Sequence, residues 1–198
     1  MNLNYFEIYE DLKKWLICKK PTATTDITSS IKEYFSIKYQ DYTVLPNDNS
    51  GEYLLDVMVT NFTPLDIIES DRNNLSITLD SIENHIAVES ELGGSGGSSA
   101  YGVQKNVVED YVKLLLVNAK YKIMIFTSLP YANENNHVAN RVDNLREIYL
   151  KVSPNNQGVL LVHLPGTQPN SNQVQACVAG LSGHIISGNG EHVGQIAT

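Results

Sequence analysis

The sequence predicts an α/β fold in which a mixed central β-sheet is flanked by helices. Apolar runs of strand length alternate along the chain with segments whose apolar residues recur at helical spacing. The predicted strands are bracketed by these helical segments, an order typical of an α/β sandwich. Apolar residues make up 42% of the 198 residues, which suits one domain with a sizeable core. We therefore expect residues 1–198 to form a single α/β domain.

The first 40 residues are expected to be helical. Residues 4–20 form an amphipathic pattern that Pro21 ends, and residues 24–39 begin with several Ser and Thr side chains that can cap a helix. The apolar faces consist of Tyr5, Ile8, Leu12, Trp15 and Leu16 in the first helix and Ile31, Tyr34, Phe35 and Ile37 in the second.

Residues 41–165 are expected to form the core of the sheet, with turns at 46–51 and 71–74. The apolar run at 52–62 predicts a strand that is buried on both faces except at Asp56. After Pro165 the chain is rich in Gly, Ser, Asn and Gln, so residues 166–198 read as an extension with one last strand at 183–188. The other expected elements are one or two strands within 76–91, a helix at 107–121, a strand at 122–129, a helix at 137–152 and a strand at 158–166.

The net charge of −8 and the pI of about 5.0 count against a protein that coats itself in nucleic acid, because phosphate contacts need clustered Lys and Arg. One local basic patch remains compatible with this charge. Six of the fourteen basic residues lie in the first 40 residues. That region is where a basic surface is expected, and the alternative is an ordinary solvated helix face.

The location expected from the sequence is the reducing cytoplasm. Cys18 and Cys177 are far apart and form neither a Cys-x-x-Cys pair nor a disulfide framework. The N-terminus has acids among its apolar residues, unlike a signal peptide. No apolar run approaches the ~18 residues of a membrane span, so no membrane association is expected.

Three carboxylates are the strongest candidates for chemistry. Asp56 lies among apolar residues, where a carboxylate is costly unless it is paired or binds a metal. Glu89 and Glu91 are two residues apart on a predicted strand, so both point to one face, which His85 shares. Such oxygen ligands suit Mg²⁺ or Mn²⁺. Alternatively, Asp56 pairs with a lysine or caps a turn, and the two glutamates are solvated at a strand end.

This pattern resembles the PD-(D/E)XK, or restriction-endonuclease-like, nuclease superfamily: Asp56 in an apolar strand, a turn, Glu-x-Glu ending the next strand, then a helix and a buried strand. The resemblance covers roughly half of the chain, from the helix that holds Glu33 to the strand at 122–129. It implies that Asp56 and Glu89 bind Mg²⁺ and that Glu33 is an accessory acid. Glu91 stands where the family has a lysine, although some restriction enzymes carry Glu there, and Leu55 replaces the usual proline.

The resemblance implies a metal-dependent nuclease that hydrolyses DNA phosphodiesters, in bacterial or phage defence or in DNA processing, and such enzymes often act as dimers. Lys105 could replace the missing lysine or lie on the surface, and Lys113 and Lys122 have no evident role. The alternative is a non-catalytic module that keeps the fold and binds a protein partner, as the acidic pI and the missing lysine suggest.

Other motifs predict little chemistry. The glycine-rich segment 93–99 lacks the spacing of a phosphate-binding loop and resembles a flexible linker. The five histidines include no His-x-x-x-His pair, so no zinc helix is predicted. His163 lies in a predicted buried strand and is expected to be a hydrogen-bonded core residue.

Overall fold

A computed structural model describes residues 3–47, 51–52, 54–63, 68–70, 75–77, 81–94, 99–152, 157–170 and 173–196. The turn expected at 71–74 lies outside the described residues, as do parts of the turn at 46–51 and of the expected strand at 76–82.

The described residues form helices and strands in the order that the sequence predicts, with additional short strands. The helices are α1 (Tyr5–Lys19), α2 (Thr24–Lys38), α3 (Ala100–Leu116) and α4 (His137–Val152). The strands are β1 (Thr43–Leu45), β2 (Val57–Thr60), β3 (Ile68–Ser70), β4 (Leu75–Ile77), β5 (Asn84–Glu91), β6 (Gly93–Gly94), β7 (Tyr121–Ser128), β8 (Val159–Asn170), β9 (Gln173–Ala176), β10 (Ser182–Ile186) and β11 (His192–Gln195).

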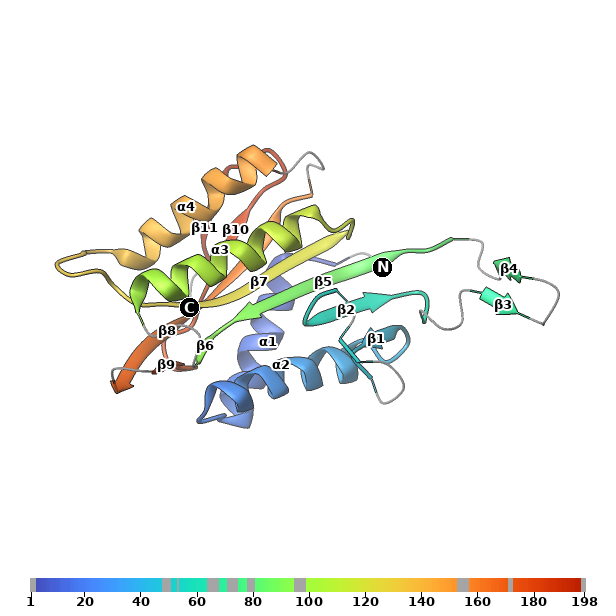
Figure 1. Cartoon of the computed structure of the whole chain (residues 1–198), viewed down its shortest axis with the longest axis horizontal. Coiled ribbons are helices and arrows are strands. Elements are labelled where there is room, and N and C mark those ends of the chain that lie inside the picture. The colour runs from blue at the N-terminus through green and yellow to red at the C-terminus, as the bar shows by residue number, and fades with distance from the viewer. Residues whose placement is uncertain are drawn as a thin grey trace.

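The main sheet is mixed, with the strand order β1-β2-β5-β7-β8-β10-β11. β5, β7 and β8 run parallel to one another, and the strands on both sides of this group are antiparallel. The helices α3 and α4 make the two crossover connections that parallel neighbours require. Figure 1 shows α1 and α2 on one face of the sheet and α3 and α4 on the other. The predicted mixed sheet flanked by helices is therefore confirmed.

Two hydrophobic cores lie between the sheet and its helices. All eight residues of β7 are buried, because this strand is central and both of its faces are covered. Its side chains alternate between the cores: Ile123 and Ile125 pack under α1 and α2, whereas Met124 and Phe126 pack under α3 and α4. The short β3–β4 pair lies apart, at one end of the molecule (Figure 1).

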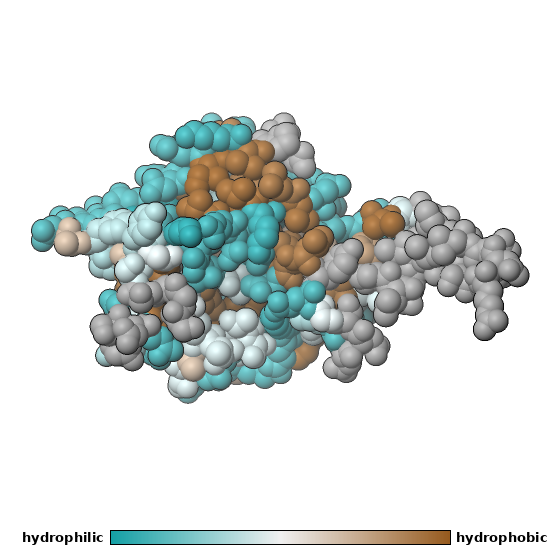
Figure 2. All heavy atoms as spheres, viewed as in Figure 1, coloured by the Kyte–Doolittle hydropathy of each residue, from teal (hydrophilic) through white to brown (hydrophobic). Residues whose placement is uncertain are grey.

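Part of the apolar surface of α3 and α4 is exposed to solvent. Figure 2 shows apolar residues gathered over α3 and α4. Leu116, the last residue of α3, is 72% exposed, and Leu150 of α4 is 52% exposed. None of the helices in the described ranges is long and apolar enough to cross a membrane.

Several predicted boundaries are wrong for identifiable physical reasons. The helix expected from residue 107 begins at Ala100, because the hydroxyl of Ser99 accepts a hydrogen bond from the Gly102 N–H at 3.0 Å. The strand expected at 52–62 spans only Val57–Thr60, since the backbone of Leu54 adopts φ 70° and interrupts the extended chain. The extension contains β9, β10 and β11 rather than one strand, and β1 was not predicted.

Gly183→Ala is expected to lower the free energy of unfolding by about 1–3 kcal/mol. Gly183 lies in β10 directly against the ring of Tyr9, and a Cβ atom there would come within 2.6 Å of Cδ2 of that ring. Tyr9 is fully buried, so its ring has no space into which it can move. Urea unfolding measures the change. Gly51→Ala is the matched control, because among the described residues no atom beyond its chain neighbours lies within 4 Å of its Cβ position. Equal stability of the two variants would contradict this account.

Candidate functional site

The predicted carboxylates lie where β2 begins and β5 ends. β2 and β5 are antiparallel, with Val57 opposite Val88. The residue before Val57 and the residue after Val88 are Asp56 and Glu89, so the two acids are neighbours at the same end of the strand pair. The side chain of Glu89 is buried, with a residue exposure of 3%. Residues far apart in sequence are thus placed together by strand pairing.

The Asp56 carboxylate caps the strand pair. Its Oδ2 atom accepts two hydrogen bonds, one from the backbone N–H of Ser90 at 2.7 Å and one from the Ser90 hydroxyl at 2.6 Å. Asp56 lies directly before the first residue of β2, and its side chain replaces the backbone carbonyl that would otherwise accept the Ser90 N–H. This arrangement matches the capping alternative for Asp56, and it accounts for a carboxylate among apolar neighbours without a metal.

Glu89 faces α3 and contacts Lys113. Their Oε1 and Nζ atoms are 2.9 Å apart, and Lys113 also lies 3.0 Å from Asp110. The same Glu89 oxygen is buried, and none of the described residues forms a well-aligned hydrogen bond with it. Burial raises the pKa of Glu89 to about 7, although Lys113 acts in the opposite direction. The paired acids raise the pKa of Lys113 above its usual value. Glu89 therefore changes charge near neutral pH.

Glu91 lies two residues further along the same face of β5. Its Oε1 accepts a hydrogen bond from the Gly93 N–H at 3.1 Å. Burial raises the pKa of Glu91, whereas the hydrogen bonds from Gly93 and Asn106 lower it. Asn106, Asp110 and Lys113 are spaced four and three residues apart, so they share the face of α3 that meets these acids.

A cavity of about 760 Å³ adjoins Glu91. Hydroxyl and amide side chains from α2, α3 and β9 form much of its wall, and its lining residues include neither Lys nor Arg. A cavity of this kind offers hydrogen bonds but no cation for a phosphate. The lining residues are Ala23, Thr24, Thr25, Thr28, Ser29, Glu91, Gly93, Asn106, Gln173 and Gln175.

The three accessory residues lie elsewhere. Glu33 pairs with Lys19 at 2.8 Å on the exposed surface of α2 and α1. Lys105 pairs with Glu109 at 3.5 Å on α3, which is the surface alternative for this lysine. His85 is at the other end of β5, 3.8 Å from Glu83 and with its ring against Tyr42.

The sequence assigned no role to Lys113, although the structure places it beside Glu89. The signal was present, because Asn106, Asp110 and Lys113 recur at helical spacing and form one polar stripe on the helix. Among the residues that the structure describes, no three His, Cys, Asp or Glu side chains are grouped closely enough to share a metal ion.

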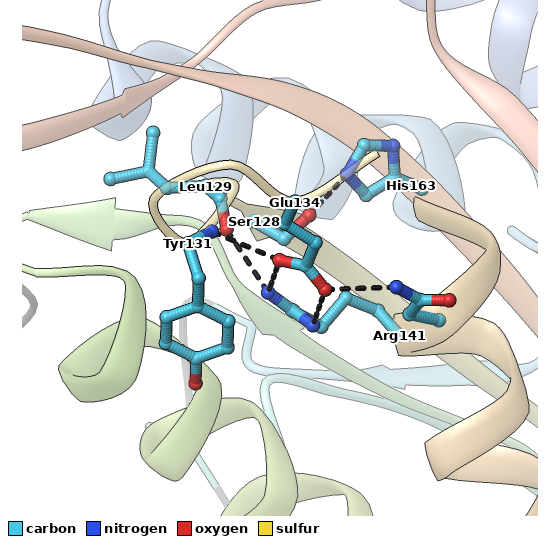
Figure 3. Close-up of polar contacts among 7 residues, drawn as sticks. Ser128, Leu129, Tyr131, Glu134, Arg141 and His163 are labelled. Carbon is cyan, nitrogen blue, oxygen red and sulfur yellow. Dashed lines mark hydrogen bonds and ion pairs between the residues drawn. The ribbon is translucent and has the colours of Figure 1, made fainter. Parts of the chain in front are cut away.

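A second polar cluster lies where β7 ends, beside the middle of β8 (Figure 3). The Ser128 hydroxyl and Nε2 of His163 are 2.9 Å apart, and both residues are buried. Burial lowers the pKa of His163 to about 3, so the ring is neutral and a weak base. The prediction that His163 is a hydrogen-bonded core residue is confirmed.

The neighbouring contacts in Figure 3 hold the loop between β7 and α4. The guanidinium of Arg141 donates to both carboxylate oxygens of Glu134, at 2.9 and 2.7 Å, and to the Leu129 carbonyl at 3.3 Å. Glu134 also accepts the backbone N–H of Tyr131 at 2.9 Å. The ring of Tyr131 lies 4.6 Å from the guanidinium carbon. This cluster is structural, because it ties both ends of the loop to α4.

Comparison with known proteins gives no family assignment. No protein-family model matches the chain, and no curated protein has a significantly similar sequence.

Glu89→Gln is expected to make the protein more stable at pH 8, by about 1 kcal/mol, and to leave stability unchanged at pH 5. The pKa of Glu89 in the folded protein is about 7, above its usual 4.5, so the wild type loses stability as the pH rises from 4.5 to 7. Glutamine cannot ionise and avoids this loss. Urea unfolding at both pH values measures the effect. Glu109→Gln, which makes the same chemical change on the exposed surface of α3, is the control. An equal effect of Glu89→Gln at both pH values would refute the explanation.

Proposed function

We propose that the protein is a metal-dependent nuclease that hydrolyses DNA phosphodiesters at the Asp56–Glu89 site. The observation that carries the proposal is the buried Glu89 carboxylate, which lies beside Asp56 at the end of paired strands and has the Lys113 ammonium 2.9 Å away. The PD-(D/E)XK resemblance calls for a lysine beside two acids. Here we propose that the lysine is Lys113 of α3, because Glu91 occupies the position where the family has its lysine.

The order of elements supports the same proposal. Along the chain, α2 is followed by β1, β2 and β5, which pair antiparallel side by side in the sheet, and then by α3 and the parallel strand β7. The short β3–β4 pair comes between β2 and β5, and β6 comes between β5 and α3. Asp56 directly precedes β2 and Glu89 lies near the end of β5, an arrangement comparable to the pattern on which the resemblance rests. This fold-level analogy motivates the proposal, and the side chains of the site must carry the chemistry.

The donor atoms fit a hard divalent cation. Asp56 and Glu89 would hold Mg²⁺ or Mn²⁺, and the buried Glu89 oxygen without an aligned hydrogen bond is the clearest ligand. Mg²⁺ is commonly bound by one or two carboxylates, with water and substrate phosphate completing its coordination. The ion would stabilise charge on the phosphate and lower the pKa of a bound water.

The residues of the chain have distinct proposed roles. Glu91 accepts a proton from the attacking water, since its pKa is raised by burial. Lys113, whose ammonium lies 2.9 Å from Glu89, would donate a hydrogen bond to a phosphate oxygen of the substrate. The free cysteines Cys18 and Cys177 suit the reducing cytoplasm, where such an enzyme would meet DNA.

The second candidate function is a non-catalytic binding module. Two observations favour it: the Asp56 carboxylate is already satisfied by Ser90, and the cavity beside Glu91 has no cation to receive a phosphate. In this case the acids cap β2 and pair with α3, and the protein acts through a protein partner.

Isothermal titration of Mn²⁺ and Mg²⁺ separates the two functions. Saturable binding that is lost in Asp56→Ala and Glu89→Ala, but kept in Glu33→Ala, would support the metal site. The same proteins are then incubated with plasmid and single-stranded DNA and each ion. Absence of both binding and cleavage in the wild type would leave the binding module as the function.

A further inference from the structure

The C-terminal half of α1 is the most basic part of an acidic protein. Residues 13–20 contain four lysines and no acid, whereas the whole chain has a net charge of −8. Lys20 closes the helix in the left-handed conformation, with φ 49°. This segment lies within the first 40 residues, where a basic surface was expected from the sequence. None of its residues belongs to the proposed nuclease site.

An apolar groove of about 500 Å³ lies along this half of α1. Lys13, Leu16, Ile17 and Lys20 form one wall, and residues 178–181 form the other. The four helix residues are spaced at i, i+3, i+4 and i+7, so they share one face. Ile17 is 51% exposed, which leaves an isoleucine at the mouth of the groove. The groove therefore has apolar walls with a lysine at each end.

The two lysines of the groove, like Lys14 beside them, have no acidic partner among the described residues, whereas other lysines nearby are paired. Lys19 pairs with Glu33, and Lys38 of α2 pairs with Asp11. Within the described part of the chain, no carboxylate lies within ion-pair distance of Lys13 or Lys20. The Lys13 ammonium instead lies 5.7 Å from the ring centre of Tyr9. The positive charge at the groove is therefore not neutralised by the described residues.

We infer that this groove binds an acidic amphipathic segment of a partner protein. One or two large apolar side chains of the partner fill the groove beside Leu16 and Ile17, and carboxylates on both sides pair with Lys13 and Lys20. Lys13 and Lys20 are seven residues apart along α1 and its C-cap, a rise of about 10 Å between their Cα atoms, so two carboxylates of the partner at roughly this spacing can reach both lysines. Acidic residues at i and i+7 of a helix meet this requirement, with apolar residues between them.

The positive charges of Lys13 and Lys20 favour an acidic partner segment over a neutral or basic one. Desolvated apolar contacts provide the affinity, whereas the lysine pairs select acidic sequences and speed association in an otherwise acidic molecule. The inference is independent of the proposed nuclease function, because none of the groove residues belongs to the site around Glu89.

The test selects 12-residue peptides from a phage-displayed library on the full-length protein and measures the best synthetic peptide by fluorescence anisotropy. Selected sequences are expected to have Asp or Glu on both sides of Leu, Ile or Phe. The double variant Lys13→Glu/Lys20→Glu is expected to weaken binding at least tenfold, and Ile17→Ser at least fivefold. Lys105→Glu/Lys151→Glu is the control, since it makes the same change in charge on the other face of the sheet.

Circular dichroism verifies that the variants fold. Failure to enrich acidic apolar peptides, or binding by Lys13→Glu/Lys20→Glu within twofold of the control, would overturn the inference. Phosphatidylglycerol vesicles form a separate arm. Vesicle binding that depends on Lys13 and Lys20, and that the selected peptide does not displace, would also overturn it in favour of a membrane surface.

Discussion

Asp56→Asn and Glu89→Gln are each expected to reduce Mg²⁺-dependent DNA cleavage at least about 100-fold. Both substitutions keep the size of the side chain and remove the charge that the cation needs. Lys113→Met is expected to reduce cleavage as well, because its ammonium is the cationic group beside Glu89. A gel assay of nicked and linear plasmid measures the rates at fixed Mg²⁺.

The pH dependence provides an independent check of the same site. Glu89 must lose its proton before it can bind the cation, and its pKa is about 7. Cleavage and metal affinity are therefore expected to rise between pH 6 and pH 8. Glu33→Gln is the control, because Glu33 pairs with Lys19 on the surface and is expected to leave the rate unchanged. Unchanged cleavage in Asp56→Asn would remove the proposed site.

Arg141→Met is expected to lower the free energy of unfolding by about 3 kcal/mol. The guanidinium is buried and donates hydrogen bonds to Glu134 and to the Leu129 carbonyl (Figure 3). Methionine fills part of the volume but removes the donor of the Leu129 carbonyl and leaves the Glu134 carboxylate with only the hydrogen bonds from Asn140 and the Tyr131 backbone. The loop between β7 and α4 is then held by fewer contacts. Urea unfolding at pH 7 gives the difference.

Measuring the stability of Arg141→Met and of the wild type at low pH tests whether the pairing with Glu134 causes the difference. Hydrogen bonds from Arg141, Asn140 and the Tyr131 backbone lower the pKa of Glu134 from its usual 4.5 to about 2. The stabilisation is complete above pH 4.5 and is lost as the pH falls toward 2. The gap between wild type and Arg141→Met is therefore expected to narrow over that interval. Arg146→Met, which removes a single hydrogen bond to Gly190, is expected to have a smaller effect. Equal losses in the two variants would contradict the role of the Glu134 pair.

Much of the fold follows from local patterns. The helical spacing of apolar residues predicted α1, α2 and α4 nearly to the residue, and continuous apolar runs predicted β7 and the first part of β8. Periodicity succeeds there because each element buries a face that its own sequence specifies. It predicted β2 with bounds that are too wide and missed β1, β9 and β11, which are short and depend on a partner strand more than on their own composition.

The sequence by itself determined the α/β class, the two helices of the first 40 residues, and the presence of acids at the ends of two strands. Tertiary structure decided what those acids contact. Strand pairing placed Asp56 against Ser90, and the turn of α3 placed Lys113 against Glu89. His85, Glu33 and Lys105 lie away from the site in the folded protein, although their positions in the sequence suggested a role there as well. Side-chain partners depend on register and helix rotation, which are fixed by packing across the whole sheet and not by any one segment.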